Sequence, residues 1–298
     1  MNTLEILDNF AKTHNCLVGI CDASPLDEAF LSGFVPFVSK DIKKRTDPTA
    51  VLPNAKSVIV VGVGEAGTLP KPDEIPPGAP MAQLSSLGTN YDYHIRVKEI
   101  LHKLVAALGL SSNYKILVDS PTLDERAFAK RAGIGFFGRN GLIVSQKFGS
   151  RFNIGLLVTD IPGCMVNMPA SRPESCPPNC RNCITACPGK ALQPGHPLDV
   201  SRCVSYLTQK KELTADDEAL LMVGGQLYGC DICQDVCPFN HPREATYVNP
   251  GEWLNMSDSS FAEKYASTAM LWQGADILRR NARLICKLCY NLKNLKGE

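Results

Sequence analysis

The stretch CPPNCRNCITACP, residues 176–188, decides how the second half of this chain folds. Its cysteines are Cys176, Cys180, Cys183 and Cys187, and a proline follows the last of them. A second stretch, CDICQDVCP at 230–238, ends in the same way. Its cysteines are Cys230, Cys233 and Cys237, and Cys203 lies alone between the two stretches. Short spacings let successive thiols surround one compact centre, so the sequence predicts metal binding here.

The two Cys-Pro endings favour iron–sulfur clusters over other metals. In two-cluster ferredoxins the cysteine before the proline binds the other cluster, and that rule predicts two complete [4Fe–4S] ligand sets. The first set is Cys176, Cys180, Cys183 and Cys237, and the second is Cys187, Cys203, Cys230 and Cys233. Zinc held by four thiolates is the alternative. One departure is the three-residue gap after Cys176, where ferredoxins have two residues.

Bulk composition indicates a cytoplasmic protein that does not enter a membrane. The 298 residues allow more than one domain, and the longest apolar run, SVIVVGVG at 57–64, is far too short for a membrane span. The first residues predict an amphipathic helix with Leu4, Leu7 and Phe10 inward, not a signal peptide. A net charge of +1 excludes a generally basic surface, so any nucleic-acid binding must be local. The run from 279 to 296, with six basic residues, is one such place.

The region before the cysteines alternates predicted strands and helices. Residues 55–64 predict a buried strand, and YKILVDS predicts another that ends at Asp119. TLDERAFAKRAG predicts a helix with Thr122 and Glu125 as a capping box. GIGFFG at 133–138 matches a dinucleotide-binding pattern, but it follows a helix, so we set that function aside. The five histidines are scattered and are expected to be surface or packing residues.

Several stretches together resemble the epoxyqueuosine reductase family. They are VDSPTLDERAFAKRAGIGFFGRNGLIV (118–144), CRNCITACPGKAL (180–192), LDVSRCVSYLT (198–208) and LYGCDICQDVCPFN (227–240). The resemblance implies a cobalamin enzyme with two [4Fe–4S] clusters that reduces an epoxide on a modified tRNA base to an alkene. The implied fold is α+β: a nitroreductase-like cobalamin-binding domain at 1–163, a two-[4Fe–4S] ferredoxin-like domain at 164–245 and a short helical C-terminal segment at 246–298.

The resemblance also assigns roles to residues. Asp119 matches the carboxylate beside the cobalt, and its implied role is general acid for the opening epoxide. Such an acid must stay protonated near neutral pH, so we expect it in an apolar pocket roofed by cobalamin. The positions that match corrinoid contacts are Arg45, Asn140, Ile143, Ser205 and Tyr228.

Partners follow from the same resemblance. An external electron donor of the ferredoxin or flavodoxin type is implied, with a monomeric enzyme and a tRNA substrate. Family members continue as HEAT-like helical repeats, whereas here ILRRNARLICKLCYNLKN predicts a first repeat helix with Leu278, Ile285, Leu288 and Leu292 on one face. We therefore expect a short member with a reduced grip on tRNA. The alternatives are a related corrinoid reductase of small molecules and an electron carrier that reduces another protein's corrinoid.

Overall fold

A computed structural model describes residues 2–28, 31, 38–65, 75–162 and 175–296, with side chains up to 290. The chain divides into two compact units that interleave along the sequence. The first comprises Met1–Glu65, His94–Cys180 and Pro238–His241, and the second comprises Ala66–Tyr93, Arg181–Cys237 and Pro242–Glu298. Helices and strands in both units confirm the α+β class. The boundaries 1–163, 164–245 and 246–298 stay a prediction.

The first unit is built on an antiparallel sheet in the order β1-β2-β7-β4. Its strands are β1 (Leu17–Asp22), β2 (Ser57–Gly64), β7 (Phe152–Thr159) and β4 (Tyr114–Leu117). Every residue of β2 is buried, because this apolar strand is paired on both sides. The strand predicted for residues 55–64 is thus confirmed.

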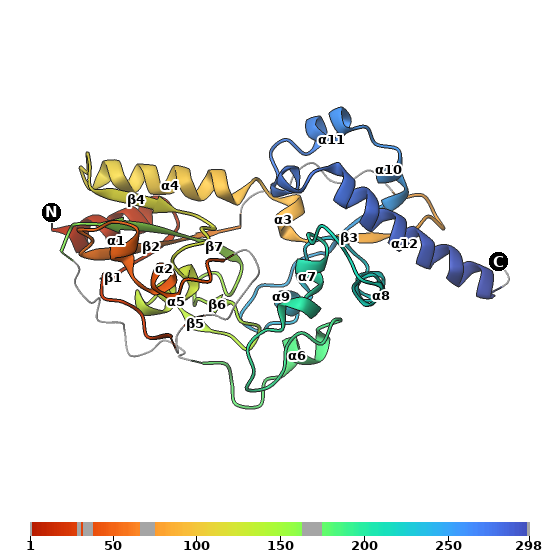
Figure 1. Ribbon diagram of the computed structural model, residues 1–298, viewed down its shortest axis with the longest axis horizontal. Helices are drawn as coiled ribbons and strands as arrows, with labels where there is room; N and C mark the ends of the chain where they lie inside the picture. The colour runs from red at the N-terminus through yellow and green to blue at the C-terminus, as the bar shows by residue number, and fades with distance from the viewer. Residues whose placement is uncertain (1, 29–30, 32–37, 66–74, 163–174, 297–298) are drawn as a thin grey trace. The chain divides into compact units, whose positions relative to one another are not determined.

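Helices cover both faces of this sheet. The helix α4 (Tyr93–Ala107), yellow in Figure 1, packs so closely on β7 that a Cβ at Gly155 would lie 2.5 Å from Cγ1 of Val97. On the other face, α5 (Glu125–Arg131) places Phe128 in a core with Val60 and Leu156. Side chains alternate between the faces of a strand, so Gly155 and Leu156 serve different layers.

The N-terminal helix α1 (Thr3–Thr13) packs on β1 and buries Leu7 and Phe10, as predicted. The prediction for Leu4 was wrong, because its side chain is 42% exposed. Leu4 and Phe10 are six positions apart, which places them about 120° apart around the helix. Only one edge of that arc faces the core.

Short elements complete the first unit. They are α2 (Ile42–Thr46), the 3-10 helix η2 (Pro48–Ala50), and the hairpin of β5 (Phe136–Phe137) with β6 (Ile143–Val144). The GIGFFG stretch follows α5 and contains β5, so it lacks the strand-then-helix context of a dinucleotide fingerprint. The predicted position of this stretch directly after a helix is confirmed.

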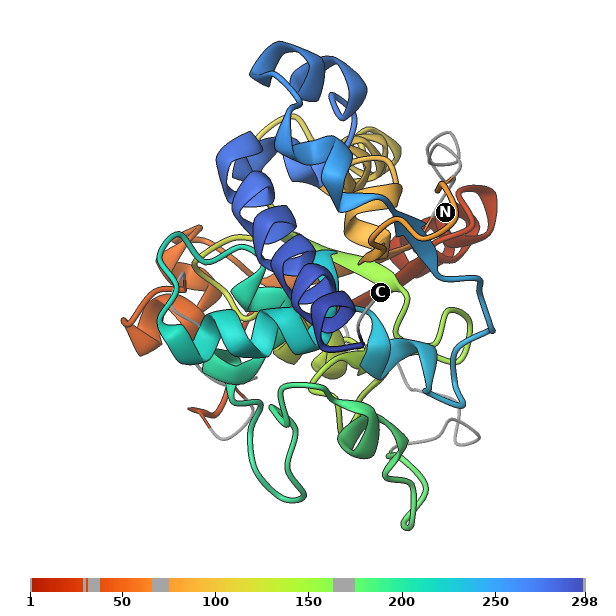
Figure 2. The same cartoon turned by 90° about the vertical axis from the view of Figure 1, so that its right-hand side faces the viewer.

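The second unit combines a small sheet with the long helix α12 (Ala275–Lys296). Strand β3 (Ala82–Leu84) pairs in parallel with β8 (Gln226–Tyr228) and antiparallel with β9 (Thr246–Val248). In Figure 2, α12 lies beside α8 (Ala215–Gly224), with which it packs. The remaining elements are α3 (Ser86–Thr89), α6 (Asn182–Ala186), η3 (Val200–Arg202), α7 (Val204–Leu207), α9 (Ile232–Asp235), α10 (Pro250–Leu254), α11 (Asp258–Lys264) and η4 (Ala269–Gln273).

The predicted apolar face of α12 is confirmed in its first half. Leu278 and Ile285 are 0% and 2% exposed and belong to the core of this unit, whereas Leu288 is half-buried. Leu292 lies outside the described side chains. The buried Asn281 donates to the carbonyls of Thr208 (2.8 Å) and Leu227 (2.9 Å), which ties the helix to the chain that carries the cysteines. No helix among the described residues has the length and apolar character needed to cross a membrane.

Candidate functional site

Both cysteine stretches fold around a single helical turn. In the first, Cys180 precedes α6, Cys183 lies within it and Cys187 ends it. In the second, Cys230 precedes α9, and Cys233 lies within it, with Cys237 just beyond. The turns α6 and α9 pack against each other, and the side-chain amide of Asn182 donates to the carbonyl of Val236 at 3.2 Å. Equal spacing in the sequence has thus produced equal local structure.

The second predicted ligand set gathers within the second unit. Its thiols, Cys187, Cys203, Cys230 and Cys233, are free and lie close enough to influence one another electrostatically. Burial is the main cause that raises the pKa of Cys203 and Cys233, and it raises the pKa of Cys230 to about 12. Neighbouring cysteines raise all three further, whereas backbone N–H groups lower the pKa of Cys203 and Cys230. Several thiolates crowded into a buried space repel one another, and a cationic centre removes that repulsion.

Backbone N–H groups point at the sulfurs of this set. Ala191 donates to Sγ of Cys187 at 3.3 Å, Ser205 and Tyr206 donate to Cys203, and Ile232 donates to Cys230. Such N–H···S bonds stabilise thiolates and tune cluster potentials. Within the described parts of the chain, no three His, Cys, Asp or Glu side chains converge as a site for a single metal ion.

The cysteines of the first predicted set, Cys176, Cys180, Cys183 and Cys237, are divided between the two units, so contacts within each unit are described separately. Cys183 and Cys237 belong to the second unit, and Cys176 and Cys180 to the first. In the first unit, the N–H of Arg139 donates to Sγ of Cys176 at 3.4 Å, and a turn links Cys180 to Pro177. Assignment of this set to one cluster stays a prediction.

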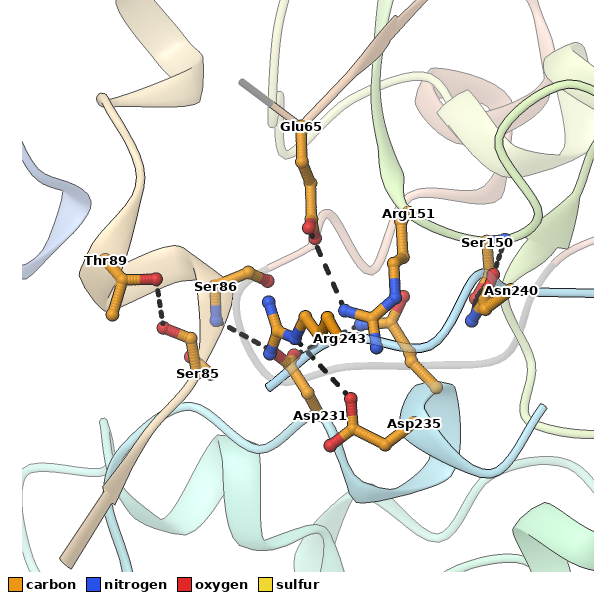
Figure 3. Close-up of polar contacts among 11 residues, drawn as sticks. Glu65, Ser85, Ser86, Thr89, Ser150, Arg151, Asp231, Asp235, Asn240 and Arg243 are labelled. Carbon is orange, nitrogen blue, oxygen red and sulfur yellow. Dashed lines mark hydrogen bonds and ion pairs between the residues drawn. The ribbon is translucent and has the colours of Figure 1, made fainter. Parts of the chain in front are cut away.

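A buried carboxylate holds the second cysteine loop in place (Figure 3). Asp231, between Cys230 and α9, is almost fully buried, accepts from the N–H of Ser86 at 2.7 Å and forms an ion pair with Arg243. Arg243 also lies 3.6 Å from the carboxylate of Asp235. The guanidinium balances two negative charges beside the thiols, which rigidifies the loop. Figure 3 also draws the 3.8 Å ion pair of Arg151 with Glu65 in the first unit.

The proposed acid, Asp119, lies on a tight turn after β4. Its φ of 51° is in the left-handed region, which aspartate tolerates better than most residues. Its carboxylate is 51% exposed and lies 3.4 Å from Nε2 of His94. The described residues therefore leave about half of the Asp119 side chain open to solvent and do not by themselves form the apolar pocket expected around it. The expectation that the histidines are surface or packing residues stays a prediction, and the His94 side chain is 21% exposed.

The helix after this turn is capped differently from the prediction. Asp124, not Thr122, is the N-cap of α5, and its carboxylate accepts from the N–H of Ala127 at 3.1 Å. The same carboxylate forms an ion pair with Arg45 at 2.6 Å, and both side chains are buried. Glu125 turns back and accepts from the N–H of Ser120 at 3.2 Å. Thr122 lost the cap because its hydroxyl lies 2.7 Å from that of Ser120.

The residues that match corrinoid contacts lie in different settings. In the first unit, Asn140 is buried and Ile143 is part of the core. The Oδ1 of Asn140 accepts from Leu142, whereas its Nδ2 has no hydrogen-bond partner among the described residues. In the second unit, Ser205 is half-buried, and Tyr228 is a core residue whose hydroxyl donates to the carbonyl of Ala269.

Comparison with known proteins first defines the class. Residues 176–240 match the profile of the "4Fe-4S double cluster binding domain", which contains every cysteine of the two sets. Residues 45–120 match the profile "Epoxyqueuosine reductase QueG, DUF1730", which contains Arg45 and Asp119. The chain thus combines a domain of the iron–sulfur class with a preceding region that matches the epoxyqueuosine reductase profile.

Individual relatives fix the family. An epoxyqueuosine reductase of Bacillus cereus is 33% identical over 90% of this chain and 75% of its own length, and that of Escherichia coli is 31% identical over 77% and 62%. The solved enzyme from Streptococcus thermophilus superposes with a TM-score of 0.80 at 28% identity, covering 96% of this chain and 81% of that one. The chain belongs to the epoxyqueuosine reductase family.

Sequence reasoning missed the residues that support the predicted ligands. The ion pair of Asp231 and Arg243 could not be predicted, because the only sequence feature that pointed to it was an acidic residue, Asp231, inside a Cys-x-x-Cys loop. Glu125 was noticed only as a cap, and its contact with the Asp119 turn was not foreseen. These roles depend on tertiary contacts that spacing does not encode.

Proposed function

We propose that this chain reduces epoxyqueuosine to queuosine in tRNA, as a cobalamin-dependent iron–sulfur oxidoreductase. The observation that carries the proposal is the 33% identity with a Bacillus cereus epoxyqueuosine reductase over 90% of the chain. A solved epoxyqueuosine reductase bound to an epoxyqueuosine-modified tRNA-Tyr stem loop supports it further, with a TM-score of 0.81 over 95% of this chain. The tRNA substrate of that relative is the substrate we assign here.

The donor sets of the chain suit the proposed cofactors. Cys187, Cys203, Cys230 and Cys233 are buried or half-buried neighbours with N–H groups aimed at sulfur, as [4Fe–4S] ligands require. The other cysteines, Cys176, Cys180, Cys183 and Cys237, are assigned to the second cluster by the ferredoxin crossing rule. In the first unit, the buried Nδ2 of Asn140 is a donor suited to a polar edge of cobalamin. We assign the nitroreductase-like, cobalamin-binding role to residues 1–163.

The reaction sets what the protein must supply. Conversion of an epoxide to an alkene breaks both C–O bonds and forms a C=C bond, so it consumes two electrons and two protons and releases the oxygen as water. When bound, cobalamin would supply the reducing electrons, and the clusters held by the eight cysteines would connect it to an external electron donor. The remaining task, proton delivery to the leaving oxygen, falls to side chains.

Asp119 is the side chain that we place at the leaving oxygen. It lies on an exposed turn, with His94 at 3.4 Å to orient its carboxyl. A solved Bacillus subtilis relative carries its catalytic aspartate on a loop that was captured swung out of the active site, and a half-exposed turn suits such a loop. The buried Arg45–Asp124 pair anchors the helix that follows. Ile143, Ser205 and Tyr228 are the remaining proposed cobalamin contacts.

The experiment is turnover of epoxyqueuosine-containing tRNA by the reconstituted enzyme under reducing, oxygen-free conditions. We expect queuosine as product, and we expect Asp119→Asn to keep both cofactors while kcat falls about 10²- to 10⁴-fold, the usual contribution of general acid catalysis. Asp8→Asn, in an exposed ion pair on α1, is the matched control and should retain activity. Cobalamin binding without any tRNA turnover would favour a reductase of small molecules, and clusters without cobalamin binding would favour an electron carrier.

A further inference from the structure

The carboxyl of Glu125 grips the turn that carries Asp119. Although Glu125 is the first residue of α5, its side chain reaches back toward the turn. Its Oε1 accepts from the N–H of Ser120 at 3.2 Å, and the N–H of Asp119 also donates to this carboxyl. Two consecutive amides of the left-handed turn are thus held by one side chain, and Asp119 cannot move away from its observed position without breaking them.

Burial decides the charge of Glu125. Removal from water raises the pKa of its carboxyl to about 8, and the negative charges of Asp119 and Asp124 add to this, against the lowering effect of the two N–H groups. The charged or titratable groups around the cluster are Arg126 on α5, Arg45 on α2, which pairs with Asp124, and His94 on α4, whose Nε2 lies 3.4 Å from the Asp119 carboxylate. Because the pKa is raised, the carboxyl is protonated at neutral pH and loses its proton as the pH rises through about 8.

The proton of the Glu125 carboxyl lies next to Asp119, which needs a proton to act as an acid. Carboxyls that face water are ordinarily ionised at neutral pH, and half of the Asp119 side chain faces water. Each turnover of the proposed reaction consumes two protons, so the acid must also be refilled. Two interacting carboxyls titrate as a pair, and in this pair the pKa of Glu125 is raised by removal from water.

Building on the proposed function, we propose that Glu125 is the positioning residue for Asp119: it holds the Asp119 turn through two backbone amides and supplies the proton that Asp119 passes to the leaving oxygen. In the step, the O–H bond of Glu125 breaks and one forms on Asp119, while the O–H of Asp119 passes to the substrate oxygen. Glu125 becomes a carboxylate bound by the two amides and is later reprotonated from solvent. The relay ends on an alkoxide, a far stronger base than either carboxylate, so it is downhill overall.

The test is the variant Glu125→Gln, with Glu99→Gln on the exposed face of α4 as control. Glutamine keeps an acceptor for the N–H of Ser120 but holds no acid proton. For the wild-type enzyme we expect kcat to fall as the pH rises through about 8. For Glu125→Gln we expect a loss of about 10²-fold at neutral pH, with KM for tRNA unchanged and no alkaline limb near this pH. Because the two residues act in series, adding Glu125→Gln to Asp119→Asn should cost little more.

A readout without turnover separates this inference from the proposed function. In infrared difference spectra of the full chain, a protonated-carboxyl band should vanish as the pH passes about 8, be missing in Glu125→Gln, and titrate at lower pH in Asp119→Asn. Amide exchange at Ser120 should match the wild type in Glu125→Gln and be faster in Glu125→Ala. An inactive wild-type enzyme would overturn the proposed function. An active wild type with an equally active Glu125→Gln variant, or no such band, would overturn the role of Glu125.

Discussion

Replacing Asp124 by alanine should destabilise the protein more than any exposed charge would. The carboxylate has two tasks in the first unit: it caps α5 through the N–H of Ala127, and it neutralises Arg45 at 2.6 Å. The Arg45 and Asp124 side chains are only 4% and 3% exposed, so water cannot replace the lost partner. Removing one member of a buried pair costs about 3–5 kcal/mol, and losing an N-cap about 0.5–2 kcal/mol. Because one group performs both tasks, we expect a loss of about 4 kcal/mol rather than the full sum.

The assay is urea unfolding without oxygen, followed by far-UV circular dichroism. Asp8→Ala is the control, because the Lys12–Asp8 pair has the same 2.6 Å separation but side chains that are 73% and 63% exposed. We expect that control to lose only about 0.3–0.5 kcal/mol. Asp124→Asn keeps a capping oxygen and removes the charge, so it isolates the ion pair. Equal losses for Asp124→Ala and Asp8→Ala would refute the assignment of stability to burial.

Two further predictions concern the second unit. Cys203→Ala should lower the iron content from about eight to about four per chain and leave the other cluster largely intact, whereas Cys16→Ala, in a buried thiol of the first unit, should leave it unchanged; unaltered iron in Cys203→Ala would contradict the crossed assignment. Asn281→Leu should lower the free energy of unfolding by about 2–4 kcal/mol, because two buried carbonyls lose their donor; a neutral result in urea unfolding would show that these carbonyls find other partners.

Periodicity predicted the elements whose burial follows from their own sequence. The valine-rich run of β2 is buried throughout, and α4 ends where Gly109, with φ of 66°, allows a left-handed turn. The cysteine spacing predicted the ligand candidates for the same reason, since the one-turn helices α6 and α9 are local structures. In each of these cases the chain needs only near neighbours to adopt its shape.

Contacts between distant residues were out of reach. The bond from Ser86 to Asp231 joins residues 145 positions apart, and the Arg45–Asp124 pair joins residues 79 positions apart. The residues next to Asp231 or Arg45 in the sequence do not indicate which distant residue it will contact. The predicted cap of α5 was wrong for a different reason: Thr122 and Asp124 both suit an N-cap, but the Thr122 hydroxyl lies 2.7 Å from that of Ser120 instead.

The most direct test of the central claim is cofactor content. The protein should be purified without oxygen and mixed with cobalamin, and its absorption and EPR spectra should be recorded with its iron and cobalt content. We predict bound base-off Co(II) together with about eight irons per chain. Iron–sulfur spectra with no affinity for cobalamin would contradict the account, and Asp119 would then be a turn residue in an electron carrier.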